Sequence, residues 1–350
     1  MNARAQIRLL PDGRLHLHDG PIDIVLEAWD SNHRAISTSV ILSGAPAGRS
    51  EADAQSKDPR PAYGPAIAAG SSPNEIRREG EAIQTAYRAA STRFLTILDE
   101  LCSELPLLRS QTRPGAQKPV GSTAQRMFAA VLPYAEEHFI TPMAAVAGAV
   151  AEETLQAMTD TADLTRAYVN DGGDIALHLA PEETFNVAMV DRPDRPSLFG
   201  TVTLHASDSV RGLATSGWRG RSFSRGIADA VTVLAKTASM ADAAATIIAN
   251  AVDLPGYPAI SRVPARELAP DSDLGEILVT TAVPSLNSWE IVEALSRGTE
   301  WAERLRGQGL IHAAALHLQG TTHIVATAES RHPSQPGILH TPAPRNAAYA

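Results

Sequence analysis

The segment 230–252 constrains the fold of this chain more than any other. Residues 230–234, with the sequence AVTVL, form a short apolar run that contains β-branched residues, which is typical of a buried strand. Residues 239–252 follow closely and are rich in Ala and Ile, which predicts a helix. The chain therefore contains a buried strand that leads directly into an apolar helix.

The chain as a whole divides into four regions by composition and periodicity. Residues 1–43 alternate apolar and polar positions around Asp-Gly turns, which predicts a small antiparallel β meander. Residues 44–73 are rich in Gly, Pro, Ser and Ala, and we interpret them as a flexible insertion. Residues 74–328 contain the remaining helices and strands and form the main domain. The proline-containing segment 329–350 lacks periodicity and is expected to be a disordered tail.

Three further elements are marked clearly within the main domain. Apolar residues recur at steps of three or four from Pro73 onward, which predicts a long amphipathic helix. A second helix is predicted at 287–306, and a hairpin at 310–328 turns at Gln319-Gly320.

The composition is that of a globular protein of moderate acidity. Hydrophobic residues make up 44% of the 350 residues and charged residues 20%, with a formal net charge of −9. This charge disfavours non-specific nucleic-acid binding. The single cysteine, Cys102, cannot form an intramolecular disulfide, which favours a reducing compartment. With no apolar run long enough to span a membrane and no signal peptide, we expect a cytoplasmic protein.

Asp242 and Thr246 form the first candidate site. They are four residues apart on the predicted helix, so their oxygen atoms lie on one face and suit a hard cation such as Mg²⁺. The same residues allow a structural interpretation. Ser239 and Asp242 fit a variant of a helix-capping box, and the Thr246 hydroxyl can bond to a backbone carbonyl.

The second candidate site is the turn N-D-G-G-D between two predicted strands. Paired glycines let a ligand approach the backbone and expose its N–H groups. A plain hairpin turn explains the same residue types. The residues that we assign to ligand binding here are Asn170, Gly172, Gly173 and Asp174.

The third candidate site is the loop 215–222, with the sequence TSGWRGRS. Hydroxyl groups, glycines and arginines in one loop suit phosphate oxygens, and this cluster of arginines stands out in an acidic chain. A solvated surface loop is the alternative. The residues that we assign to a phosphate ligand are Thr215, Ser216, Gly217, Arg219, Arg221 and Ser222.

Taken together, several motifs resemble those of the ApbE-like superfamily, which contains the FAD:protein FMN transferases. They are PMAAVAGA at 142–149, GGDI at 172–175, ADAVTV at 228–233 and ADAAAT at 241–246. In that superfamily, a strand of the S-V-T-V type precedes an A-D-x-x-x-T helix, and a Gly-Gly-Asp turn lies upstream. The motifs are specific in combination and lie within a resemblance that covers roughly residues 80–327 with gaps.

The resemblance implies an α+β fold with mixed sheets and flanking helices around a central cleft that holds FAD or FMN. It also implies that Mg²⁺ is held by Asp242, Thr246 and the backbone carbonyl of Ala147. The implied reaction passes FMN from FAD to a hydroxyl group of an acceptor protein. A homodimer is one assembly that the sequence leaves open.

This chain departs from the transferases at two positions. Their G-G-x-A-K-G-type segment contains a lysine, whereas residues 146–152 of this chain read VAGAVAE. Their H-x-I-x-D-P-type segment contains a histidine, whereas residues 222–229 read SFSRGIAD, and Asp229 is the best remaining base. A metal-dependent enzyme that transfers FMN or cleaves FAD therefore competes with two alternatives. These are a flavin- or phosphate-binding protein without turnover and a maturation factor for a redox enzyme.

Overall fold

A nine-stranded sheet organises the chain in the computed structural model, which describes residues 5–31, 39–42, 73–190 and 198–326. Every pair of neighbouring strands in this sheet is antiparallel. In spatial order the strands are β1 (Gln6–Leu9), β2 (Leu15–Asp19), β3 (Ile22–Trp29), β5 (Arg166–Asp171), β6 (Asp174–Leu179), β9 (Gly212–Ser216), β10 (Ala230–Ala235), β13 (Ala313–Leu318) and β14 (Thr321–Val325).

Two smaller sheets accompany it. In the first, β4 (Ser39–Leu42) runs parallel to β7 (Thr184–Val190), which pairs antiparallel with β8 (Leu198–His205). In the second, β11 (Ser261–Pro264) and β12 (Leu278–Ala282) are antiparallel. The α+β class is confirmed, but mixed pairing is confined to the three-stranded sheet. The large sheet is antiparallel because tight hairpins join several of its consecutive strands.

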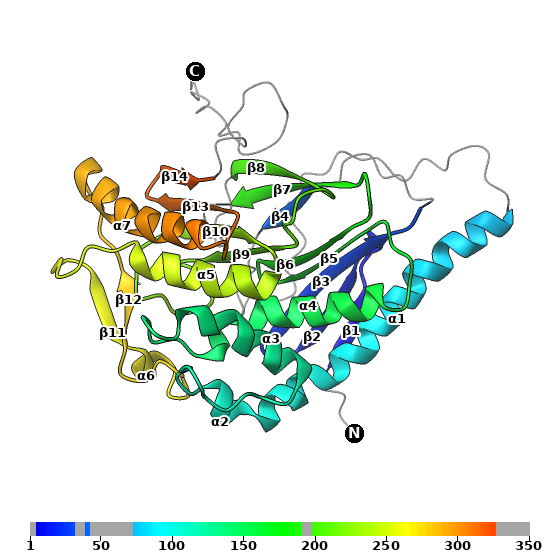
Figure 1. Cartoon of the computed structure of the whole chain (residues 1–350), viewed down its shortest axis with the longest axis horizontal. Coiled ribbons are helices and arrows are strands. Elements are labelled where there is room, and N and C mark those ends of the chain that lie inside the picture. Colours follow the sequence, from blue (N-terminus) through cyan, green and yellow to red (C-terminus); the bar gives the residue numbers. More distant parts are fainter. Residues whose placement is uncertain (1–4, 32–38, 43–72, 191–197, 327–350) are drawn as a thin grey trace, which may run out of the picture.

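Helices cover one face of the large sheet, and the three-stranded sheet covers the other (Figure 1). Two apolar cores lie on the helical side, and a third, which contains Trp29, Tyr168 and Phe185, lies beneath β7 and β8. The helices are α1 (Pro73–Ser103), α2 (Leu105–Leu108), α3 (Ser122–Val131), α4 (Val146–Thr159), α5 (Ala238–Ala251), α6 (Ala265–Leu268) and α7 (Ser288–Gly307), with 3₁₀ turns η1 (Leu132–Tyr134) and η2 (Pro142–Ala145).

Small residues allow α4, α5 and β9 to approach closely. A Cβ at Gly148 in α4 would overlap the backbone of Ala238 in α5. A Cβ at Gly212 in β9 would overlap the backbone of Thr237. Both glycines therefore permit backbone-to-backbone packing at the start of α5, which fixes the position of the helix that carries Asp242.

The N-terminal meander is present as β1 to β3, and it continues directly into the large sheet. β3 pairs antiparallel with β5, from the register Ile24↔Asp171 to Trp29↔Arg166. The predicted insertion at 44–73 and tail at 329–350 lie outside the described residues, except for Pro73, where α1 begins. The division into domains stays a prediction. No helix in the described ranges is long and apolar enough to cross a bilayer.

Candidate functional site

Three aspartates, which we call the acid cluster, lie where the β5–β6 hairpin meets α5. Asp171 ends β5, Asp174 begins β6, and Asp242 lies in α5. Burial raises the pKa of Asp171 and of Asp174 to about 7. Burial also raises the pKa of Asp242 well above its usual value, and the charges of Asp174 and Asp171 raise it further. The cluster therefore retains protons to a higher pH than ordinary aspartates do.

The Gly-Gly turn that joins β5 to β6 is covered by an arginine side chain. Gly172 and Gly173 have φ values of +67° and +111°, and the Gly173 N–H donates to Asn170 Oδ1 at 2.8 Å. The Arg221 guanidinium lies where a Cβ at Gly172 would be, and its Nη2 is 3.7 Å from Asp171 Oδ1. The hairpin interpretation is thus confirmed, and two residues from separate candidate segments, Gly172 and Arg221, lie together.

Asp242 is held by the first turn of α4. The Gly148 N–H donates to Asp242 Oδ2 at 3.1 Å, and the Ala147 N–H also donates to this carboxylate. Amide groups at a helix N-terminus stabilise negative charge, so α4 orients the carboxylate and opposes the rise in its pKa. Ala147 thus faces Asp242 with its N–H group. Its carbonyl belongs to a helix in which carbonyls point along the axis toward later amides.

The capping box expected at Ser239 and Asp242 is wrong. Thr237 is the N-cap residue of α5, and its hydroxyl accepts from the Met240 N–H at 3.3 Å. The helix begins at Ala238, so Ser239 already lies in the first turn, and its N–H donates to Glu152 Oε1 at 2.6 Å. Asp242 is therefore released from a capping role.

Thr246 lies one turn after Asp242 on the same helix. In α4, Thr154 donates its hydroxyl to the carbonyl of Val150, as the structural interpretation of Thr246 would require. No such bond is found for Thr246 within the described ranges. A carboxylate and a hydroxyl are hard oxygen donors, and this donor set fits Mg²⁺. The described residues contain no group of three or more His, Cys, Asp or Glu side chains arranged for a metal.

The end of β9 connects the loop 215–222 to the acid cluster. The Thr215 N–H donates to Asp174 Oδ1 at 3.2 Å, and the Thr215 hydroxyl is 2.9 Å from that of Thr232. Gly217 approaches the backbone carbonyl of Asp229. Ser216 is half-buried, and Ser222 is exposed. The loop thus starts at the acid cluster.

Arg219 and Asp229 form an ion pair with each other rather than facing an open ligand site. Arg219 Nε donates to Asp229 Oδ1 at 2.7 Å, and its guanidinium stacks on Trp218 at 4.2 Å from the ring centroid. The Gln319 N–H donates to Asp229 Oδ2 at 2.7 Å. Both oxygens of this buried carboxylate accept hydrogen bonds, which favours a structural role over that of a base.

A family model, described as AbpE bacteria, matches residues 74–324. The match covers more than half of the chain and includes every residue of the acid cluster. The chain belongs to this family. The membership confirms the resemblance to ApbE-like proteins that the motifs indicated.

AbpE family membership agrees with the other similarities. A UPF0280 protein of Methanopyrus kandleri is 40% identical over 116 residues, which is 33% of this chain and 45% of that protein. A UPF0280 protein of Methanococcoides burtonii is 37% identical over 127 residues, 33% of this chain and 47% of that protein. The chain thus spans about half the length of these curated relatives.

A solved structure also resembles the chain. It is a mutant of the flavin transferase ApbE from Vibrio cholerae, with 12% identity and a TM-score of 0.29. The similarity covers 74% of this chain and 90% of that one.

Sequence reasoning missed two residues of the candidate site. Asp171 belongs to the acid cluster, but its place next to two glycines made it look like a turn residue. Glu152 accepts from the start of α5, although nothing in its local sequence indicates a contact 87 residues away. Helical spacing could have placed Glu152 on the same face of α4 as Gly148, because the two residues are four apart.

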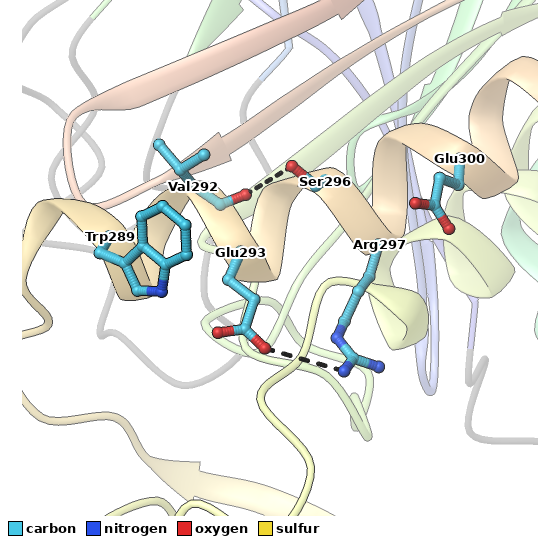
Figure 2. A pocket seen from close by; sticks show the side chains of 6 residues that line it. All are labelled: Trp289, Val292, Glu293, Ser296, Arg297 and Glu300. Atoms are coloured by element: carbon cyan, nitrogen blue, oxygen red, sulfur yellow. Dashed lines mark hydrogen bonds and ion pairs between the residues drawn. The ribbon is translucent and has the colours of Figure 1, made fainter.

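A separate hollow runs along the outer side of α7 (Figure 2). Its lining consists of α7 residues alone, among them the exposed Trp289 and the ion pair of Glu293 with Arg297 at 3.8 Å. The Ser296 hydroxyl donates to the Val292 carbonyl at 2.8 Å. No residue of the acid cluster or of the loop 215–222 lines this hollow, so it is distinct from the candidate site.

Proposed function

We propose that the protein binds a flavin nucleotide together with a divalent cation at the acid cluster, and that it acts on the pyrophosphate bond of FAD. One observation carries this proposal. Burial raises the pKa of Asp171, Asp174 and Asp242, and the negative charge of Asp171 raises the pKa of the other two further. A cation there would relieve their repulsion, which makes the site suited to metal binding. Family membership supports the flavin as the ligand.

In this proposal, Asp242 and Thr246 hold the cation, for which Mg²⁺ fits the hard oxygen donors. When bound, the cation withdraws electron density from the pyrophosphate and neutralises its charge. Ala147 contributes through its N–H group, which orients Asp242, rather than through its carbonyl. Asp174 and Asp171 add negative charge beside Asp242, which strengthens cation binding once they are ionised.

Arg221 is the proposed phosphate ligand. Its Nη2 lies 3.7 Å from Asp171 Oδ1, which is longer than a hydrogen bond, so Arg221 can exchange Asp171 for a phosphate oxygen. Arg219 already donates to Asp229 and stacks on Trp218, so we no longer assign it to phosphate binding. The remaining residues that we place around the ligand are Asn170, Gly172, Gly173, Asp174, Thr215, Ser216, Gly217 and Ser222.

The arrangement favours slow cleavage over rapid transfer. In cleavage, a water oxygen bonds to the phosphorus of the FMN half, the bond to the bridging oxygen breaks, and AMP leaves. The water proton passes to solvent. Transfer to an acceptor protein additionally needs a base at its hydroxyl, and Asp229 has both oxygens occupied. We therefore expect FMN and AMP as the main products, with weak transfer to a protein acceptor.

Because both Asp229 oxygens already accept hydrogen bonds, a second candidate function is also favoured. A site that holds cation and flavin without a base would serve as a flavin-binding protein or as a maturation factor that delivers flavin to a redox enzyme. Such a protein binds FAD in a cation-dependent manner but leaves it intact.

Incubation of the protein with FAD and Mg²⁺, followed by chromatography of the nucleotides, separates these functions. The enzyme produces equal amounts of AMP and FMN, and chelation of the metal stops the reaction. The same incubation with Asp242→Asn is the matched control for contaminating phosphatases. Intact FAD that binds only with Mg²⁺ would support the binding protein, and the absence of both binding and cleavage would contradict the proposal.

A further inference from the structure

A second cavity lies next to the first turn of α5. It has a volume of about 260 Å³. Its lining comes from α3, η1, α4, the start of α5 and the segment before β13, and includes Arg126, Ala129, Tyr134, Glu152, Ser239 and Met240. Its size is below the range of about 300–1,000 Å³ of most ligand sites, so it has room for one ring system and not for a dinucleotide.

Tyr134 supplies an unused hydrogen-bonding group in this cavity. Its side chain is only 4% exposed, and burial raises the pKa of its hydroxyl. No hydrogen-bond partner for this hydroxyl is found in the described part of the chain. The fully enclosed polar atoms that lack a partner in the described residues do not include this hydroxyl, so it is open to the cavity, and an acceptor brought by a ligand would take the place of water there.

The charged groups at the rim are already paired with each other. Arg126 Nη1 donates to Glu152 Oε2 at 3.1 Å, and Arg126 Nε donates to Glu153 at 2.9 Å. The other oxygen of Glu152 accepts from the Ser239 N–H, which occupies the place where a helix N-terminus would otherwise hold an anion. The cavity therefore favours a neutral ligand, and its walls of Ala, Pro, Met and Leu favour an apolar one.

We propose that this cavity binds a small neutral aromatic compound with a carbonyl oxygen that accepts from the Tyr134 hydroxyl. The ring lies against the apolar walls, and the carbonyl is the single polar anchor. This site is separate from the acid cluster and does not depend on the flavin function. Asp242 lies three residues after Ser239 on the same helix, so occupants of the two sites would share α5.

Ligand-detected NMR with benzamide tests the proposal, with benzoate as the matched probe that differs only in its charged group. The wild-type chain should bind benzamide and should bind benzoate at least about tenfold more weakly, because Glu152 repels it. Tyr134→Phe keeps the ring and removes the hydroxyl, and it should weaken benzamide binding about fivefold, the effect of one neutral hydrogen bond. Ala129→Trp fills the cavity from an exposed position of α3 and should abolish binding.

Glu136→Trp places the same ring at an exposed position outside the cavity and should leave benzamide binding unchanged. Circular dichroism of each variant establishes that it is folded. Wild-type protein that does not bind benzamide would overturn the inference. Equal binding by Ala129→Trp, or tighter binding of benzoate than of benzamide, would do the same, because the ligand would then lie elsewhere or be held by Arg126.

Discussion

The Arg221 guanidinium occupies the space beside Gly172 in which any other residue would place a Cβ. The two residues are 49 positions apart and belong to different candidate segments. Gly172 also has a φ of +67°, so two requirements for glycine coincide at one position. The glycine in this turn thus leaves space for the Arg221 side chain, which lies next to Asp171 of the acid cluster.

Gly172→Ala should therefore displace Arg221 and weaken FAD binding as well as stability. The strain of a left-handed alanine costs about 1 kcal/mol of unfolding free energy, and displacement of the arginine weakens FAD binding. Gly115→Ala is the matched control, because Gly115 has a φ of +78° and nothing within 4 Å of its Cβ position. Urea denaturation and FAD titration of both variants check this. Equal losses in the two variants would remove the special role of Gly172.

Arg221→Ala and Arg219→Ala should have different effects. Loss of Arg221 should weaken FAD binding about 10- to 100-fold with little change in stability, because its guanidinium contacts Asp171 only loosely. Loss of Arg219 should destabilise the fold by about 1–3 kcal/mol, since it leaves the buried Asp229 without its charged partner. Flavin fluorescence and urea denaturation measure the two quantities. The opposite pattern would place Arg219 at the ligand.

The stability of the metal-free protein should fall as pH rises from about 4 to about 7. The pKa of Asp171 is about 7 in the folded chain against an ordinary value of 3.8, so the folded state binds more protons than the unfolded state between these values. Stability is then highest below pH 4 with respect to this group and is lost as pH rises through 7. Asp174 acts in the same direction.

Asp171→Asn should flatten this dependence and make the protein more stable at pH 8. Urea denaturation at pH 5 and pH 8 in the presence of EDTA measures it. An unchanged slope in the variant would show that Asp171 does not retain a proton in the folded state.

Thr237→Ala should destabilise the protein by about 1 kcal/mol, because it removes the N-cap of α5. Ser239→Ala should cost less, since within the described residues the Ser239 hydroxyl makes one contact, 3.2 Å from the hydroxyl of Thr237. Thermal denaturation of the two variants ranks them. A larger loss for Ser239→Ala would restore it as the capping residue.

Local patterns predicted the elements of this fold well. The apolar spacing marked α1, the Ala-rich run marked α5, and the Gln319-Gly320 turn was found between β13 and β14. Each of these depends on residues that are close in sequence. Spacing on a helix also placed Asp242 and Thr246 on one turn, because that geometry is the same in every α-helix.

Local patterns could not predict which distant segments pack together. The antiparallel order of the large sheet depends on pairs such as Ile24 with Asp171, and no local signal specifies a partner at that separation. The acid cluster combines Asp171 and Asp174 with Asp242 from a distant helix, and its raised pKa values arise from burial and from the neighbouring aspartates in the folded chain. The pairing of Asp229 with Arg219 and the Gln319 amide likewise depends on β10 lying beside β13.

Calorimetric titration of Mg²⁺ into the protein with ADP, for the wild type and for Asp242→Asn, tests the central claim most directly. Asparagine resembles the protonated carboxyl group in shape, so the variant should fold as the wild type does, and circular dichroism verifies this. The account predicts a single saturable Mg²⁺ site in the wild type and none in the variant. Mg²⁺ binding that is absent from both proteins, or equal in both, would contradict it.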